Sequence, residues 1–152
     1  MELEDVFRAH QQAVFAYFLR VIGNRQDAEE LTQETFVRAC SAAIRFRGDS
    51  SVKTWLFGIA RRVLLEASRA GLFDRTEQLP DVAAAGDRAD VRIDLERALA
   101  SLGVSDREAL VIVDVLGFEP REAAAIVGVS AETFRVRLHR ARRRFREAYG
   151  GV

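Results

Sequence analysis

Cysteine and histidine are scarce in this chain of 152 residues, which contains one Cys and two His. Cys40 has no second cysteine to pair with, so a disulfide framework is excluded. With only His10 and His139 beside this thiol, the sequence lacks a recognisable set of metal ligands. We therefore expect no metal and no cofactor, and we expect Cys40 to be a buried structural thiol.

Long apolar runs are also missing. The longest are far too short to cross a bilayer, and the N-terminal MELEDVFRAHQQ is acidic and polar where a secretory signal is basic and then apolar. These absences predict a cytoplasmic protein without membrane insertion. The sequence also has no phosphate-binding loop and no nucleophile triad, which argues against an enzyme.

Neither charge is in excess, because 23 basic residues balance 23 acidic ones. The balance hides an alternation along the chain. Residues 45–70 contain six basic and two acidic side chains, and residues 131–152 contain seven and two, whereas residues 1–44 and 71–130 are net acidic. Two basic blocks in a neutral chain predict two separate surfaces for a polyanion, with the acidic stretches left to meet protein or solvent.

The spacing of apolar residues is helical throughout, and no stretch alternates strictly enough for a strand, so we predict an all-α protein. A first helix should run from about Leu3 to Ile22 and stop at Gly23, and Asn24 should cap a second helix that reaches about Ile44. Further helices are expected at about Val52–Ala70, Asp90–Ser101, Asp106–Leu116, Pro120–Val127 and from Ala131 onward.

Residues 71–90 hold one of the two prolines, two glycines and little periodicity, which is typical of a linker. We therefore predict two small helical domains joined by a flexible linker over residues 71–91. Beyond the linker, Ser105 and Glu108 have the S-x-x-E spacing of a capping box, which predicts that Ser105 caps the next helix.

The C-terminal residues predict a helix-turn-helix. A short helix over Pro120–Val127, a turn containing Gly128 and a cap at Ser130 precede a helix with seven arginines. On that helix the apolar residues form a stripe about 80° wide, and the arginines occupy the opposite side and the flanks. The stripe is too narrow for a membrane-surface helix, and two acidic residues are too few for an ordinary solvated face. We therefore expect this helix to enter the major groove of DNA.

The third helix carries the other basic block. Most of its apolar residues, Trp55 among them, repeat with the spacing of a buried stripe. Phe57 lies roughly 200° around the helix from Trp55, between Lys53 and Arg61 at i−4 and i+4. An exposed aromatic ring between cations suits stacking on unpaired bases. Packing of Phe57 against another domain remains the alternative interpretation.

The second helix has an acidic outer edge. Its inward positions are expected to be Ala28, Leu31, Thr35 and Ala39. Glu30, Gln33, Glu34 and Val37 share the outward edge at i, i+3, i+4 and i+7. No His, Ser or Gly-rich loop accompanies these carboxylates, so acid–base catalysis is disfavoured. The edge is interpreted as a solvated face or as a docking surface for a basic protein partner.

Four segments together resemble the extracytoplasmic-function sigma factors, the small two-domain members of the bacterial sigma-70 family. They are NRQDAEELTQETFVRA, FRGDSSVKTWLFGIARRVLLEASR, DREALVIVDVLGF and GVSAETFRVRLHRARRRFRE, which match the region 2 and region 4 signatures in order and spacing. The resemblance implies that residues 1–70 are sigma region 2, which binds the promoter −10 element and core polymerase. It implies a linker over 71–91 and sigma region 4, which binds the −35 element, over 92–152.

The resemblance also implies which side chains bind. The residues implied to grip the β′ clamp helices of core RNA polymerase are Glu30, Gln33 and Glu34. The −10 contacts are implied for Phe46, Arg47, Lys53, Phe57, Arg61 and Arg62. The −35 contacts are implied for Arg135, Val136, His139 and Arg140, with Arg121, Arg137 and Arg142 as phosphate contacts.

The predicted function is that of a dissociable sigma factor, which directs promoter-specific transcription initiation. Its predicted partners are core RNA polymerase and promoter DNA, and the resemblance adds an anti-sigma factor as inhibitor. The alternative is a stand-alone helix-turn-helix transcriptional regulator that does not associate with polymerase. In that case the N-terminal half would be a dimerisation or sensor domain.

Overall fold

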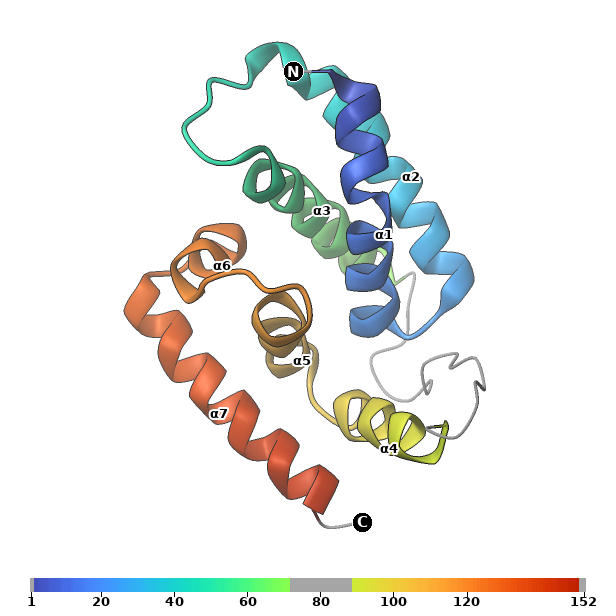
Figure 1. Cartoon of the computed structure of the whole chain (residues 1–152), viewed down its shortest axis with the longest axis vertical. Helices are drawn as coiled ribbons and strands as arrows, with labels where there is room; N and C mark the ends of the chain where they lie inside the picture. Colours follow the sequence, from blue (N-terminus) through green and yellow to red (C-terminus); the bar gives the residue numbers. More distant parts are fainter. Residues whose placement is uncertain (1, 72–88, 151–152) are drawn as a thin grey trace.

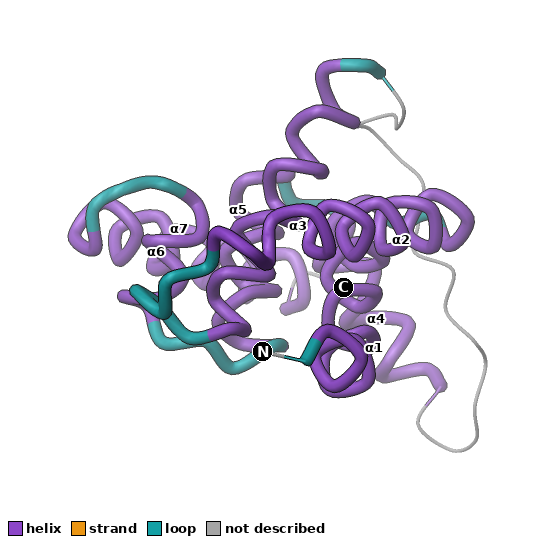
Figure 2. Tube along the Cα trace, turned by 90° about the horizontal axis from the view of Figure 1, so that it is seen from above, coloured by secondary structure: helices purple, strands orange, loops and turns teal. Residues whose placement is uncertain are grey.

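In the computed structural model of the protein, residues 2–71 and 89–150 are described, and the side chains of the second segment are described from residue 94. Every regular element within these ranges is a helix, and no strand occurs in them (Figures 1 and 2). The prediction of an all-α fold is therefore confirmed. The predicted linker over residues 71–91 lies mostly outside the described residues, so its flexibility stays a prediction.

The first half of the chain is a bundle of three helices. They are α1 (Leu3–Ile22), α2 (Arg25–Ala42), which continues into the 3-10 turn η1 (Ala43–Arg45), and α3 (Val52–Arg69). The end of α1 is set by Gly23, whose left-handed backbone (φ 84°) suits glycine and whose N–H donates to the Leu19 carbonyl at 2.8 Å. The start of α2 is set by Asn24, whose side chain accepts a hydrogen bond from the Asp27 N–H at 2.9 Å. Both predicted boundaries are confirmed.

The second half contains the helix-turn-helix. Its elements are α4 (Ala89–Ala100), α5 (Val104–Leu110), the π-helical stretch η3 (Val111–Val115), α6 (Pro120–Val127) and α7 (Ala131–Gly150). α7 is the long helix that ends the described chain, and both α5 and α6 pack against it (Figure 1). The predicted order of short helix, turn and long basic helix is therefore present.

The predicted capping box at the start of α5 is wrong. The N-cap of α5 is Gly103, whose backbone is extended (φ −62°, ψ 158°), and Ser105 lies inside the helix. The Glu108 carboxylate does not turn back toward the start of α5, because it contacts Tyr17 and Arg61 of the first half. A residue with capping-box spacing thus serves as an interior acceptor instead.

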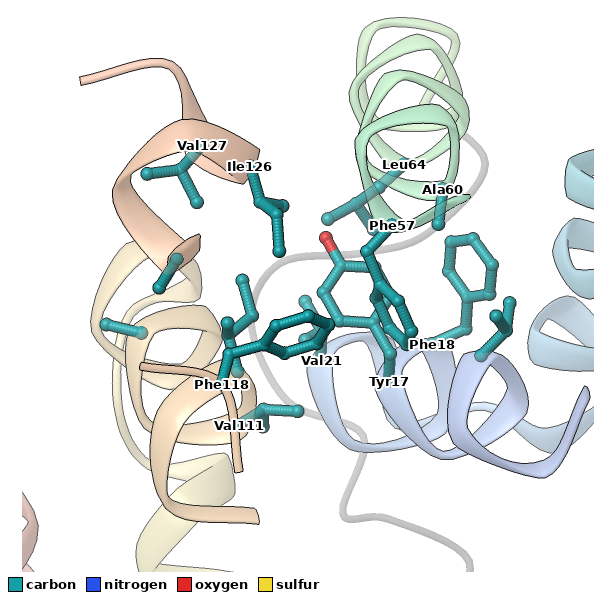
Figure 3. Close-up of a cluster of buried hydrophobic side chains, with 14 of the residues drawn as sticks. Tyr17, Phe18, Val21, Phe57, Ala60, Leu64, Val111, Phe118, Ile126 and Val127 are labelled. Carbon is teal, nitrogen blue, oxygen red and sulfur yellow. The ribbon is translucent and has the colours of Figure 1, made fainter. Parts of the chain in front are cut away.

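One hydrophobic core joins the two halves. α3 packs against α6, and α1 packs against α5. Figure 3 shows the junction, where Phe118 points toward Phe57 of α3 and Tyr17 of α1. Phe57 and Tyr17 are fully buried, and Phe118, in the loop before α6, is also buried. The halves that carry the two basic blocks are thus packed together.

Candidate nucleic-acid interface

The backbone around the turn between α6 and α7 has helix-turn-helix geometry. α6 ends at Gly128, which adopts a left-handed backbone (φ 76°). α7 starts behind Ser130, whose hydroxyl accepts a hydrogen bond from the Thr133 N–H at 3.1 Å. The predicted apolar stripe of α7 faces the core: Phe134, Leu138 and Ala141 are buried, and Phe145 and Ala148 are half-buried. The opposite face of α7 is therefore held outward by the packing behind it.

The residues predicted to meet the −35 element lie on this helix-turn-helix. Arg135, Val136 and His139 are exposed on α7, and Val136 is 64% exposed. Arg121 is exposed on α6, and Arg137 is half-buried on the flank of α7. The fold thus brings these five candidates onto one motif.

Three arginines of α7 are held by carboxylates of the preceding elements. Asp106 of α5 accepts hydrogen bonds from Arg140 and Arg144, and Asp114 of η3 accepts two from Arg142, at 2.7 and 3.0 Å. The hydrogen bond to Asp114 raises the pKa of the Arg142 guanidinium. Arg140 and Arg142, both predicted to contact DNA, are therefore already bonded on one side of the guanidinium.

Three of the six candidates for the −10 contact remain at the surface. Phe46 follows η1 and is half-buried, with its ring centroid 5.1 Å from that of Trp55. Trp55 packs against the core, as its position in the apolar stripe predicts. Arg47, in the loop, and Arg62, on α3, are exposed. This part of the predicted −10 surface is accessible in the structure.

The prediction that Phe57 is an exposed ring is wrong. Its side chain is fully buried, with its ring centroid 5.1 Å from that of Phe118 and 5.7 Å from that of Tyr17. α3 packs against α1 and α2 and also against α6, so its second side is covered by protein. The alternative interpretation, packing of Phe57 against another part of the chain, is the arrangement observed.

Two cations of α3 are covered by the second half as well. Lys53 Nζ lies 4.7 Å from the centroid of the Phe118 ring and 3.4 Å from the Leu116 carbonyl oxygen. Arg61 Nε donates a hydrogen bond to Glu108 Oε2 at 3.1 Å. In this arrangement the charged groups of Lys53 and Arg61 therefore contact protein atoms of the second half.

Glu108 joins α1, α3 and α5 at one buried point. The Tyr17 hydroxyl donates to Glu108 Oε2 at 2.6 Å, and the Glu108 side chain is 5% exposed. Burial, together with the adjacent Glu108 carboxylate, raises the pKa of the Tyr17 hydroxyl well above its ordinary value. Tyr17 thus keeps its proton and remains the hydrogen-bond donor.

Sequence reasoning missed the buried charges at the start of α5. Asp106, Arg107 and Glu108 are consecutive, and all three are buried. Arg107 donates to the carbonyls of Val21 and Leu102, which links α1 to the turn after α4. The available signal was a run of three charges directly before an apolar run, DREALVIVDVL. Buried charges need partners, so such a run indicates ion pairs across the core.

The outer edge of α2 is exposed as predicted. Ala28, Leu31, Thr35 and Ala39 are buried, and Glu30, Gln33, Glu34 and Val37 are exposed. Arg38, beside this edge, donates to Glu34 at 2.9 Å and to Glu66 of α3 at 2.6 Å. These two hydrogen bonds raise the pKa of the Arg38 guanidinium, which stays charged. The edge is therefore an acidic strip with an apolar side chain, Val37, at its end.

Cys40 is exposed on α2, so the prediction of a buried structural thiol is wrong. The thiol lies one helical turn beyond Val37, on the outer side of α2, where none of the described helices covers it. In the described residues, no group of three or more His, Cys, Asp or Glu is arranged to hold a metal ion. No helix in the described part of the chain is long and apolar enough to span a membrane.

Comparison with known proteins gives two family matches that follow one another along the chain. The model of sigma-70 region 2 matches residues 6–71, and the model of sigma-70 region 4 matches residues 92–145. The ECF RNA polymerase sigma factor SigC of Mycobacterium tuberculosis is 36% identical over 151 residues, which cover 92% of this chain and 79% of that protein. The RNA polymerase sigma factor YlaC of Bacillus subtilis is 28% identical, with 92% and 87% covered.

A solved structure has the same fold over nearly the whole length. The sigma factor RpoE from Bartonella quintana, in complex with the anti-sigma factor NepR, superposes with a TM-score of 0.83. The two chains are 27% identical, and the match covers 95% of this chain and 94% of that one. These findings do not favour the alternative of a stand-alone regulator. The chain belongs to the sigma-70 family, as an RNA polymerase sigma factor of the extracytoplasmic-function type.

Proposed function

We propose that this sigma factor divides promoter recognition between its two basic surfaces. In the proposal, residues 1–70 bind core polymerase and the −10 element, residues 92–152 bind the −35 element, and residues 71–91 connect them. The two matched regions, 6–71 and 92–145, support this division. The proposal gives the protein no catalytic activity of its own and places it in the cytoplasm with the polymerase.

The observation that carries the proposal is the exposed basic face of α7 behind the turn at Gly128. Arg135 and Arg140 are the proposed base readers, because a guanidinium can donate two hydrogen bonds to one guanine in the major groove. Val136 and His139 lie beside them on the same face. The phosphate contacts proposed for the same motif are Arg121, Arg137 and Arg142. Such contacts supply affinity and make it depend strongly on salt.

The acidic strip on α2 is the proposed polymerase-binding surface. Glu30, Gln33 and Glu34 are exposed on one edge of a helix whose other side is fixed in the core. A rigid acidic edge complements a basic helical partner, and we assign it to the β′ clamp helices of the polymerase. Neither basic surface of the sigma factor is part of this edge, so polymerase and promoter can bind at the same time.

The −10 surface requires a change of arrangement before it can work as proposed. Phe46, Arg47 and Arg62 are accessible, whereas Lys53, Phe57 and Arg61 contact the second half. The proposed sequence is that the halves separate on the polymerase and that Phe57 then stacks on an unpaired base of the opened duplex. Base stacking on an aromatic ring tolerates different bases, which suits strand capture.

An anti-sigma factor is the proposed inhibitor. The support is the solved complex of a sigma factor with an anti-sigma factor, whose sigma chain has the same fold at 27% identity. A protein that stabilises the packed arrangement of the two halves would keep Phe57 and Arg61 from promoter DNA.

The decisive test is run-off transcription with purified core polymerase and a randomised promoter library. The expected result is transcripts that depend on added sigma factor and that share −35 and −10 sequences. Native mass spectrometry with core polymerase gives an independent reading, since a sigma factor forms a one-to-one complex with the enzyme. No transcript from any template, together with a homodimer that ignores the polymerase, would contradict the proposal.

A further inference from the structure

Asp106 differs from the neighbouring buried charged residues in its hydrogen-bond partners. It is 4% exposed, and both of its hydrogen-bond partners are arginines of α7. Its neighbours Arg107 and Glu108 instead contact backbone carbonyls and the first half. A carboxylate in the interior is costly unless it is paired, so the position of Asp106 depends on α7 and the position of the arginines depends on Asp106.

The geometry lets one carboxylate hold two turns of the recognition helix. Asp106 Oδ2 accepts a hydrogen bond from Arg144 Nη1 at 2.6 Å, and Oδ1 faces Arg140 Nε and Nη2, each at 3.4 Å. The two arginines are four residues apart, so they lie above one another on the same side of α7. Their side chains remain 42% and 50% exposed. Each guanidinium is thus anchored on one side and open to solvent on the other.

A second ion pair, between η3 and α7, provides a contrast. Asp114 of η3 binds Arg142 of α7 at 2.7 Å, but both side chains are more than 40% exposed. The pair is bidentate, with a second hydrogen bond at 3.0 Å, but solvent reaches both side chains and screens the attraction between them. Asp106 is 5% exposed at the side chain and lies where α5 packs against α7, so its carboxylate is held in place by the core, whereas the exposed carboxylate of Asp114 is not.

We propose that Asp106 is a positioning residue for promoter reading, which holds Arg140 in the orientation that meets one base of the −35 element. The inference rests on the proposed function of α7. A free arginine on this helix can bind any nearby phosphate, which adds affinity without sequence information. An arginine whose inner edge is hydrogen-bonded to a buried carboxylate keeps its outward N–H groups in one orientation. Asp106 therefore raises specificity and limits non-specific affinity.

The test compares Asp106→Asn with the matched control Asp114→Asn in the full chain bound to core polymerase. The probe is a promoter selected by the holoenzyme from the randomised library, measured beside the same DNA with a scrambled −35 element. For Asp106→Asn the ratio of the two affinities is expected to fall about tenfold, within the range for loss of one bidentate base contact. Binding of scrambled DNA should become stronger, and its dependence on salt steeper by about one to two phosphate contacts. Asp114→Asn should leave the ratio within about twofold, since it frees only an arginine assigned to phosphate.

A double-mutant cycle separates positioning from a merely structural role. In a chain that already carries Arg140→Ala, Asp106→Asn should not lower the ratio further, because the side chain it positions is gone. A structural role would lower the ratio in both backgrounds. Should Asp106→Asn fail to fold, Asp106→Glu serves the same cycle, because it keeps the charge and moves the carboxylate. An unchanged ratio for the folded variant overturns the inference and leaves the proposed function standing. Absence of any preference in the unaltered holoenzyme removes both.

Discussion

Removal of one hydroxyl, in Tyr17→Phe, tests whether the packed arrangement of the two halves withholds the −10 surface. Tyr17 is fully buried in α1, and its hydroxyl donates to Glu108 of α5 at 2.6 Å. Phenylalanine keeps the ring and its contacts with Phe57. Glu108 keeps Arg61 as a partner at 3.1 Å, so the carboxylate is not left alone. The substitution therefore removes a single bond between the halves and little else.

The expected magnitude follows from the kind of bond. A hydrogen bond to a charged group contributes about 1.5–3 kcal/mol, so we take about 2 kcal/mol for this bond. The melting temperature should then fall by about 4–8 °C, at about 2–4 °C per kcal/mol for a chain of this size. The same 2 kcal/mol shifts the balance between packed and separated halves about 30-fold toward separation.

The assay is binding of a fluorescent single strand with the −10 sequence of a selected promoter to the free sigma factor. Where the state with separated halves is the minor one, the apparent affinity for the −10 strand rises in proportion to the population of that state. Tyr17→Phe should therefore bind the strand up to about 30-fold more tightly. Tyr149→Phe is the matched control, because Tyr149 is exposed near the end of α7. A variant that loses stability but binds the strand like the control would refute the masking of the −10 surface. Tyr17 itself is not among the predicted DNA contacts. Tighter binding by the variant could therefore not come from a changed contact between residue 17 and DNA.

Three further outcomes are expected. Glu34→Arg should weaken binding to core polymerase by about tenfold or more, because charge reversal in a contact costs at least about 1.4 kcal/mol. The same reversal at Glu4 on α1 should leave this binding unchanged. Surface plasmon resonance on immobilised polymerase compares the two variants. Phe57→Leu keeps much of the buried volume and removes the aromatic face. Permanganate reactivity of the −10 strand should therefore fall while closed complexes still form. Reactivity equal to that of the unaltered protein would mean that Phe57 has only a structural role. Burial and the nearby Lys53 lower the pKa of His10, so the unfolded chain gains this proton at higher pH than the folded chain does. Stability should therefore be full above the ordinary histidine pKa and decline as the pH falls below it, and the decline in chemical denaturation should be smaller for His10→Gln.

The elements that sequence reasoning placed well are those defined by local signals. Gly23 and Asn24 end one helix and begin the next through their own backbone and side chain, and nothing distant is needed. The apolar stripe of α7 and the turn at Gly128 are likewise properties of neighbouring residues. Such signals predicted the all-α fold and the helix-turn-helix.

The errors concern contacts between residues far apart in the sequence. A helical wheel shows that Phe57 lies off the main stripe of α3, but it cannot show that Phe118, 61 residues later, covers it. Ser105 and Glu108 have capping-box spacing, yet the carboxylate is taken by Tyr17, 91 residues away. The position of Cys40 depends on the absence of a covering helix over α2 among the described elements. In each case the missing information was which helix surfaces pack against one another in the folded chain.

Part of the alternation of charge along the chain corresponds to ion pairs in the structure. The acidic block over residues 71–130 supplies Asp106, Glu108 and Asp114, and each of them binds an arginine of a basic block. Asp106 and Glu108 lie two residues apart on α5, but their consequences for DNA binding are opposite. Glu108 and promoter DNA compete for Arg61, so under the proposed function this pair has to separate. Asp106 holds Arg140 from the side away from solvent, so that pair has to persist while the base is read. Under the proposed function and the proposed role of Asp106, the three buried charges near the start of α5 thus serve the release of one DNA-binding surface and the alignment of the other.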